Sequence, residues 1–350
     1  MSDTKERKVT LFSKKKNDEK TFTLRSFVYG DERSVIECVR EEYGDTYYRR
    51  EYYDEDLLRK EVESGKLLLY LACFNDEVCG FQSLIRYAPE ESRIEAASQI
   101  FKKAYRGYGL PFELVKYTYE IARDYHPSCI YASTVVFHSI TQNMCELVGM
   151  VPVAFNLGSH LTSAMHNSFW LGDSEKYAQA ILILPVDKKN AGRVYIHEDI
   201  AGKAAKIYAD LGVDADIATS GDDEKNAAVS GKESCFDVSV NEREQSISIK
   251  VHSIGDDLLC KIREIKDSHS GKYWTIQLIL PVDRPEALKA YEALDKEGFY
   301  FVGLRPLCSD TEQIFLQYTG DVYFDFADFK LTPKFEQLLQ MIRNAEDGKD

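Results

Sequence analysis

The chain has 350 residues, enough for two domains of ordinary size, and either half is long enough to bury a hydrophobic core. Its 44% hydrophobic and 29% charged residues are typical of a globular protein. No apolar run reaches the roughly 18 residues of a membrane-spanning helix. The net charge of −14 argues against nucleic acid as a partner, because phosphate binding needs a basic face, and is compatible with a cationic partner.

The N-terminal segment is strongly charged and lacks the apolar core of a secretory signal. We expect residues 1–20 to form a flexible, solvated tail, although its run of Lys14, Lys15 and Lys16 could touch anions. The eight cysteines lack paired spacing, and no Cys/His cluster has the spacing of zinc ligands. We therefore expect reduced thiols in a cytoplasmic protein that binds no metal.

Alternating and apolar runs, separated by turn residues, predict a mixed α/β order for the first half. Asp31 is a residue type that caps helices, and it precedes the first helical run. In chain order we expect strand 22–27, helices 31–43 and 54–63, strands 67–74, 78–87 and 93–102, helix 110–125, strand 128–136, helix 140–148, and strands 151–157 and 180–186.

One segment, residues 100–110, lies between an expected strand and an expected helix and reads Ile-Phe-Lys-Lys-Ala-Tyr-Arg-Gly-Tyr-Gly-Leu. Free N–H groups at a helix N-terminus, together with the helix dipole, form an anion site. Gly107 and Gly109 permit positive φ and a close approach of backbone to phosphate oxygens. Arg106 offers a planar charged fork. A ligand-free turn would also use two glycines, but positive charge in an acidic protein favours a pyrophosphate site.

This segment resembles the acetyl-CoA motif Q/R-x-x-G-x-G/A of the GNAT superfamily of N-acetyltransferases. Residues 139–150 are similar to the helix and Gly-Phe turn that follow in that family. The resemblance departs at Ala104, where a polar residue is expected, and at Met150, where phenylalanine is expected. It implies that residues 21–187 form an acetyltransferase domain of mixed α/β class, with a mostly antiparallel sheet flanked by helices and acetyl-CoA as co-substrate. The cofactor-binding residues that it implies are Ile100, Phe101, Lys102, Arg106, Gly107, Tyr108, Gly109 and Leu110.

The second half, residues 188–350, repeats this plan more loosely, and the intervals 109–149 and 255–298 each hold helix, strand, helix. A stretch at 214–234, rich in Asp, Ser, Gly and Lys, is typical of a mobile loop. In chain order we expect strand 192–196, helix 198–211, strands 235–240 and 245–252, helix 256–267, strand 273–280, helix 285–296, strands 299–305 and 311–319, and an amphipathic helix 332–345.

The second half resembles the second domain of bacterial two-domain GNAT proteins, on residues 278–283, 298–303 and 315–318. Its counterpart of the phosphate turn lacks Arg-Gly-x-Gly, and Asp256 and Asp257 would repel phosphate. We therefore expect a degenerate GNAT-like copy that does not bind CoA. Its role would be structural: packing on the first half, shaping the acceptor cleft, or dimerising.

The resemblance implies direct transfer of acetyl from the thioester to an amine, which a base assists. Glu95, on an expected strand, is one candidate base, unless it is a surface glutamate. His138 is the rival, unless it only orients neighbours. Cys145 stands where the family has a tyrosine acid; it could donate a proton, but a buried inert thiol is the simpler interpretation. Backbone N–H groups near Ile100 and Lys102 could bind the thioester oxygen.

A tyrosine-rich stretch, residues 43–53, would line the acceptor site in the GNAT plan, although a plain amphipathic connector fits equally. The sequence thus favours an N-acetyltransferase acting on a small-molecule or peptide amine. The alternative is a non-catalytic acyl-CoA-binding regulatory or scaffold protein, which the cysteine at position 145 favours.

Overall fold

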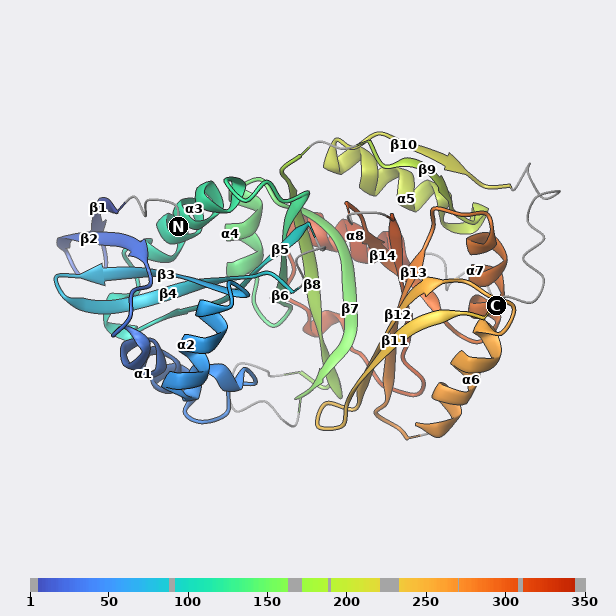
Figure 1. The fold of residues 1–350 in the computed structure, drawn as a ribbon, viewed down its shortest axis with the longest axis horizontal. Helices are drawn as coiled ribbons and strands as arrows, with labels where there is room; N and C mark the ends of the chain where they lie inside the picture. The colour runs from blue at the N-terminus through green and yellow to red at the C-terminus, as the bar shows by residue number, and fades with distance from the viewer. Residues whose placement is uncertain are drawn as a thin grey trace. The chain divides into compact units, whose positions relative to one another are not determined.

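The structure, a computed structural model, describes residues 6–87, 92–162, 172–187, 190–220, 233–269, 271–307 and 311–343. The chain forms two compact units, Met1–Ala132 (unit 1) and Ser133–Asp350 (unit 2) (Figure 1). The boundary between the units falls inside a strand, and the expected domain boundary near residue 187 lies within unit 2. That domain boundary stays a prediction.

Unit 1 is built on a sheet in which the strands follow one another in chain order. Neighbouring strands are antiparallel except for the last pair, which is parallel. The strands are β1 (Arg7–Ser13), β2 (Asp18–Ser26), β3 (Leu67–Phe74), β4 (Glu77–Ile85), β5 (Arg93–Phe101) and β6 (Cys129–Val135).

Helices cover both faces of this sheet: α1 and α2 pack on one face and α3 on the other (Figure 1). Strand β4 is buried at every position after its first residue, because a strand covered on both faces has no solvent side. The helical segments are α1 (Glu32–Tyr43), η1 (Arg50–Tyr53), α2 (Glu55–Glu63), η2 (Lys103–Tyr105) and α3 (Leu110–Arg123).

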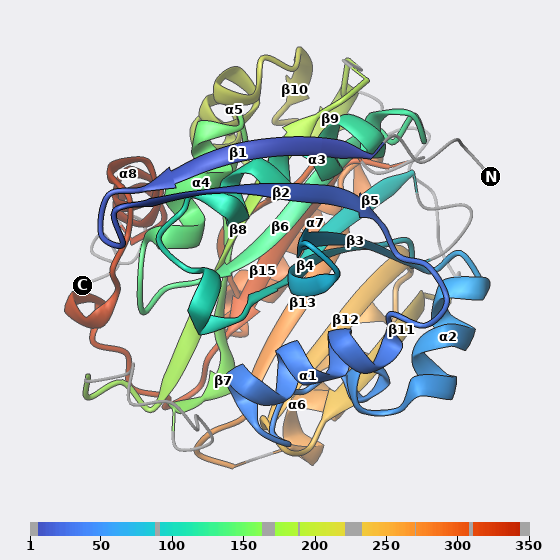
Figure 2. The ribbon, with the colours of Figure 1, turned by 90° about the vertical axis from the view of Figure 1, so that its left-hand side faces the viewer.

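The expectation of a flexible tail at residues 1–20 is wrong for the part that the structure describes. Strands β1 and β2 form an antiparallel hairpin and lie side by side in Figure 2, with Arg7 opposite Leu24 and Ser13 opposite Asp18. Asn17, at φ 52°, closes its turn. The overall charge concealed the alternation of half-buried and exposed residues along β1, which is the pattern of a strand with one covered face.

The helix cap expected at Asp31 is also different. Asp31 precedes α1, but its carboxylate makes no capping hydrogen bond to the helix. It accepts instead from both terminal nitrogens of Arg25, at 2.6 and 2.9 Å, and from the backbone N–H of Val28 at 2.9 Å. A bidentate arginine competes successfully with a backbone N–H for the same carboxylate.

Unit 2 contains the remaining elements, and these match the order expected from the sequence. The structure adds one short strand, Ala215–Ala218, inside the stretch expected to be a mobile loop, and residues 221–232 of that stretch lie outside the described part. The elements are α4 (Ile140–Leu147), β7 (Val151–Leu161), β8 (Lys176–Pro185), β9 (Gly192–Tyr195), α5 (Glu198–Leu211), β10 (Ala215–Ala218), β11 (Cys235–Asn241), β12 (Ser246–Ser253), α6 (Leu258–Ser268), β13 (Thr275–Pro281), α7 (Glu286–Lys296), β14 (Tyr300–Arg305), β15 (Gln313–Tyr318), η4 (Phe326–Asp328) and α8 (Pro333–Arg343).

The pairing pattern of the early strands recurs late in the chain. Strands β4 and β5 are antiparallel and β5 and β6 are parallel; likewise β11 and β12 are antiparallel and β12 and β13 are parallel. A helix, α3 or α6, joins each parallel pair. Strands β7 and β8 then pair antiparallel, as β14 and β15 do. The large sheet of unit 2 has the order β8-β7-β14-β15-β13-β12-β11.

Strand β7 meets β14 within unit 2, which joins the two expected halves of the chain. Gly303 pairs with Ala154, and a Cβ at Gly303 would lie 2.2 Å from the backbone oxygen of Val153. At the other end of β7, opposite Leu161, the fully buried side chain of Lys176 donates to the backbone oxygens of Gln245 and Tyr273. The close strand contact and the buried lysine both explain why the compact units do not divide at residue 187.

Candidate functional site

The connection between β5 and α3, residues 102–109, has the backbone geometry expected of an anion-binding turn. Gly107 and Gly109 have φ values of 90° and 78°, so the expected positive φ is confirmed at both glycines. Gly109 caps α3 in the left-handed conformation, and a proline lies in the first helical turn, where its missing N–H group is not needed. Two left-handed glycines before a helix direct successive N–H groups to one side.

Four consecutive backbone N–H groups of this turn are available to a ligand. Within the described residues, the N–H groups of Gly107, Tyr108, Gly109 and Leu110 have no hydrogen-bond acceptor. They stand at the N-terminus of a 14-residue helix, where the helix dipole adds positive potential. Unpaired donors in this position are the arrangement that binds phosphate oxygens.

Two charged side chains of the turn, those of Arg106 and Lys102, are paired with carboxylates of other elements. Arg106 donates to a carboxylate oxygen of Glu42 in α1 and, at 3.1 Å, to the backbone oxygen of Phe101. Lys102 donates to Glu77 at 2.9 Å. The sequence correctly predicted that cations gather here, but it did not predict these partners. An incoming phosphate would therefore compete with Glu42 for Arg106.

A backbone N–H group of the same turn also donates a hydrogen bond to a carboxylate. The N–H of Lys103 donates to Glu41 Oε1 at 2.7 Å. The N–H of Lys102 donates to the backbone oxygen of Cys79 at 2.9 Å, which extends the pairing of β5 with β4. In this structure the Lys102 amide is thus occupied by the sheet, contrary to the expectation that it could bind a thioester oxygen.

The N-terminal hairpin lies against the turn at residues 102–109. The side chain of Lys16 donates to the backbone oxygen of Ala104, and the hydroxyl of Tyr108 donates to Asp18. The Tyr108 hydroxyl lowers the pKa of the Asp18 carboxyl. The ring of Tyr108 also packs edge-on against Phe22 of β2, with 5.5 Å between ring centroids. The side chain between the two glycines is therefore an anchor for the turn.

Strands β5 and β6 separate beside this turn. Their parallel register ends where Glu95 faces Tyr131, whereas β5 continues to Phe101. A bulge lies in the continuing part: Ser98 has φ 40°, and Gln82 on β4 donates its side-chain amide to Ala97 O at 2.7 Å. Both strands continue beyond the end of their pairing, and a strand edge that has lost its partner offers backbone groups to an extended ligand.

Ile100 and Phe101 hold this end of β5 in the sheet. Ile100 is buried opposite Phe81, and Phe101 is buried opposite Gly80, where a Cβ would lie 2.4 Å from the Phe101 ring. Their side chains are therefore core residues. Only their backbone could contact a cofactor.

Glu95 is nearly buried and has two close partners. Its carboxylate accepts from the hydroxyl of Tyr87 and, at 3.5 Å, from the guanidinium of Arg49. The same guanidinium is 3.3 Å from the Tyr87 hydroxyl. The sequence missed Arg49, which lies 46 residues away from Glu95. The three side chains form a polar cluster in unit 1, and Glu95 would have to change partners to accept a proton from an amine.

The tyrosine-rich stretch belongs mostly to the core of unit 1. Tyr52 is fully buried, and its ring centroid is 5.3 Å from that of Phe81; Tyr43, Tyr47 and Tyr53 pack against the same cluster. Burial raises the pKa of Tyr52 to about 12. Tyr47 reaches the β5 bulge, where its hydroxyl is 2.9 Å from Ser98 Oγ.

His138 and Cys145 lie in unit 2. His138 Nδ1 is buried and lacks a hydrogen-bond partner among the described residues, and burial lowers the pKa of this histidine below its ordinary 6.5. Cys145 is buried on α4. A neutral imidazole with an unused nitrogen is suited to accept a proton.

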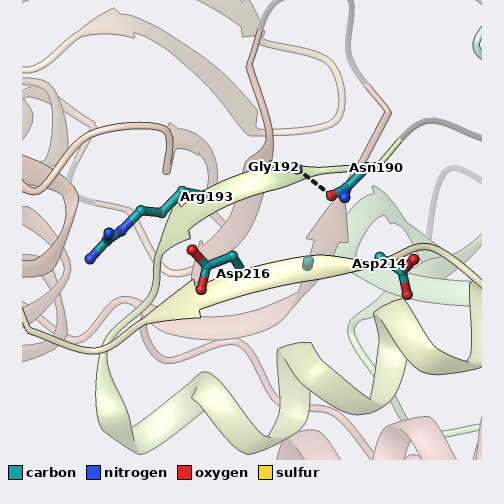
Figure 3. Close-up of a pocket in the computed structure, with 6 residues that line it drawn as sticks. Asn190, Gly192, Arg193, Asp214 and Asp216 are labelled. Atoms are coloured by element: carbon teal, nitrogen blue, oxygen red, sulfur yellow. Dashed lines mark hydrogen bonds between the residues drawn. The ribbon is translucent and has the colours of Figure 1, made fainter.

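Unit 2 has a surface hollow whose lining residues are distant in sequence from the candidate site residues (Figure 3). Its polar lining residues come from the ends of β9 and β10, and none of them is an expected site residue. In it Asn190 Oδ1 accepts from Gly192 N at 2.9 Å. The lining residues are Asn190, Gly192, Arg193, Asp214, Ala215 and Asp216.

Two further features of the described residues concern site chemistry. No group of three or more His, Cys, Asp or Glu side chains in the described ranges is arranged to hold a metal ion. No described helix is long and apolar enough to cross a membrane.

Comparison with known proteins gives a structural likeness only. No protein-family model matches the chain, and no curated protein matches it. About half of the chain is similar in structure to solved GNAT-family acetyltransferases.

Three of these structures illustrate the similarity. The yncA protein of Salmonella typhimurium, a candidate acetyltransferase solved with acetyl-CoA, is 16% identical, with a TM-score of 0.40 over 49% of this chain and 96% of its own. The phosphinothricin acetyltransferase of Sinorhizobium meliloti, in complex with AcCoA, is 18% identical, with a TM-score of 0.39 over 47% and 88%. A variant of the SpeG spermidine N-acetyltransferase of Vibrio cholerae is 14% identical, with a TM-score of 0.40 over 48% and 95%.

Proposed function

We propose that this protein is an N-acetyltransferase that transfers acetyl from acetyl-CoA to the amine of a small molecule or peptide. The observation that carries the proposal is the row of N–H groups from Gly107 to Leu110, which have no acceptor within the described residues and open a long helix. These donors would bind the pyrophosphate of CoA. The part of β5 that continues beyond its register with β6 would pair with the amide-containing arm of the cofactor.

In the proposed reaction the amine nitrogen attacks the thioester carbonyl carbon, and the C–S bond breaks as the amide forms. The amine loses a proton to a base, and the sulfur leaves as a thiolate or takes up a proton. Two groups could act as the base, Glu95 in unit 1 and His138 in unit 2. The Glu95 carboxylate already has Arg49 and Tyr87 as partners, whereas His138 Nδ1 has none in the described structure, and the choice between the two groups is left to experiment.

The base assignment is tested by the pH dependence of kcat/KM in His138→Gln and Glu95→Gln. If His138 is the base, wild-type activity should fall as the pH drops through a value below 6.5, because burial lowers the pKa of His138. His138→Gln should lose about 100-fold in kcat and lack this acidic limb. Loss of activity in Glu95→Gln, with an unchanged profile in His138→Gln, would assign the base to Glu95 instead.

The alternative is a non-catalytic acyl-CoA-binding protein that acts as a regulator or scaffold. The buried cysteine on α4, in place of a tyrosine acid, favours it. Calorimetry with acetyl-CoA, combined with a free-thiol assay over a panel of amines, separates the two functions. Binding with amine-dependent CoA release supports the enzyme; binding without release supports the alternative; no binding refutes both.

We further propose that the second half is a degenerate copy of the first, does not bind CoA, and has a structural role in packing or dimerisation. The repeated strand pairing of β11, β12 and β13 supports a duplication. Its turn keeps one glycine, Gly255, but lacks Arg-Gly-x-Gly, which supports the loss of cofactor binding. Native mass spectrometry with acetyl-CoA should therefore find one cofactor per chain.

A further inference from the structure

The Lys-rich turn of the N-terminal hairpin adjoins the phosphate turn. Lys14, Lys15 and Lys16 are exposed between β1 and β2. The last of them reaches the backbone oxygen of Ala104, and its ammonium lies 4.9 Å from the centroid of the Tyr108 ring.

Further contacts hold the two turns together. A Cβ placed on Gly107 would lie 3.6 Å from Ser13 Oγ, at the end of β1. The Asn17 N–H donates to the backbone oxygen of Ser13 at 2.8 Å and closes the hairpin. With the hydrogen bond between Tyr108 and Asp18, these contacts fix the base of the hairpin turn but leave the side chains of residues 14 and 15 exposed.

Charge around the phosphate turn is unevenly neutralised. Arg106 and Lys102 already have carboxylate partners, Glu42 and Glu77. By contrast, no described carboxylate pairs with Lys14 or Lys15.

The nearby carboxylates of the hairpin do not cancel this charge. The Asp18 carboxylate accepts a hydrogen bond from the Tyr108 hydroxyl, and its Oδ2 lies 3.3 Å from Lys20 Nζ. Glu19 is exposed opposite Phe12 on the neighbouring strand. The ammonium groups near the turn that have no described carboxylate partner are therefore those of Lys14, Lys15 and Lys16 and that of Lys103 within the turn itself. Lys16 is directed onto Ala104 and Tyr108, so Lys14 and Lys15 are the hairpin lysines whose described side chains remain exposed without such contacts.

Acetyl-CoA carries two kinds of phosphate: a pyrophosphate, and a monoester on the 3′ position of its ribose. A phosphate monoester has a charge of about −1.5 to −2 at neutral pH and attracts ammonium groups. The four N–H groups of residues 107–110 suit the pyrophosphate. We propose that Lys14 and Lys15 bind the 3′-phosphate of CoA, an inference that rests on the proposed cofactor site.

The test compares acetyl-CoA with 3′-dephospho-acetyl-CoA by calorimetry on the full chain. Wild type should bind acetyl-CoA roughly tenfold tighter at low ionic strength, and added salt should reduce the ratio, because exposed charge pairs are screened. The double variant Lys14→Gln/Lys15→Gln should bind both ligands equally, with the affinity of wild type for the dephospho ligand.

The matched control is Lys8→Gln/Lys60→Gln, which removes the same charge from two exposed lysines of unit 1. Lys8 is near the opposite end of β1, roughly 20 Å along the strand from the turn. This control should keep the wild-type preference. Thermal melting of both variants checks that the hairpin remains folded.

Three outcomes would overturn the inference. Equal binding of the two ligands by wild type would exclude a 3′-phosphate site and leave the proposed cofactor site intact. Equal weakening of both ligands in the double variant would assign the lysines to the pyrophosphate. Binding of neither ligand by wild type would refute the proposed function itself, together with this site.

Discussion

Two strand-to-helix connections occupy corresponding places in the chain, and they differ in length and chemistry. Residues 102–109 join β5 to α3, whereas only residues 254–257 join β12 to α6. The first connection has two left-handed glycines and four N–H groups without an acceptor in the described structure. The second is too short for such a loop.

In the second connection, some of the backbone N–H groups have acceptors within the protein. The N–H of Gly255 donates to Ser234 Oγ at 2.8 Å, and Asp257 accepts from the Ser234 N–H at 2.7 Å and from Lys261. Two backbone N–H groups at this turn, those of Gly255 and Leu258, thus have acceptors within the protein, and the carboxylates of Asp256 and Asp257 would repel a phosphate. The same pairing pattern of strands therefore carries two different turns, and the length and sequence of the connecting loop decide which N–H groups lack an acceptor in the described structure.

The largest effect should come from a carboxylate placed in the first connection. Gly109→Asp puts negative charge beside the free N–H groups and forces a side chain onto φ 78°, so acetyl-CoA affinity should fall more than 100-fold by calorimetry. Gly109→Ala measures the backbone strain alone and should show a smaller loss. The matched variant Gly255→Asp should leave affinity unchanged; equal losses at both turns would abolish the distinction.

A smaller loss is expected when the arginine is removed from the first connection. Arg106→Ala should weaken acetyl-CoA about tenfold, or about 1.4 kcal/mol, because a charge-assisted contact to phosphate is lost. Arg263→Ala removes a similar carboxylate-paired arginine from the second half, where Glu297 is 2.6 Å away. If both variants bind acetyl-CoA like wild type, Arg106 serves only its ion pair with Glu42.

Removing the Glu42 carboxylate, which would compete with phosphate for Arg106, should raise the affinity for acetyl-CoA. Glu42→Gln releases Arg106 from its ion pair, so acetyl-CoA should bind roughly threefold tighter at low salt. Glu297→Gln is the control in the second half and should change nothing. Weaker binding by Glu42→Gln would mean that the glutamate orients the arginine for the phosphate instead of competing with it.

The smallest effect on the cofactor is expected at the second connection. Asp256→Ala and Asp257→Ala should each keep acetyl-CoA affinity within about twofold. Lys261 lowers the pKa of Asp257 below its ordinary 3.8, so the carboxylate stabilises the fold above that pH and loses this effect as the pH falls. Asp257→Ala should therefore melt below wild type at pH 7, and the difference should shrink in acid. A change in affinity instead would place the cofactor at this turn.

Most of the local structure could be predicted from the sequence. Periodicity predicted the order of helices and strands in both halves, because burial on one face repeats at fixed intervals. The glycines at 107 and 109 predicted positive φ, because few other residues adopt it at low energy. These features depend on neighbours within a few residues.

The tertiary structure alone decided the partners. A charged segment that was expected to be solvated forms β1. It pairs with β2, and the side chains of Val9 and Leu11 are half-buried on one face of the strand. Arg106 pairs with Glu42, which is 64 residues away in the sequence, and the Asp31 carboxylate pairs with Arg25 instead of capping its helix. An ion pair or an edge strand depends on which surfaces the fold brings together. No local sequence pattern encodes the contacts between residues that are far apart in the chain. The sequence therefore determined the conformation of the glycine turn at residues 107–109, whereas the fold determined which lysines, glutamates and strand edge surround it.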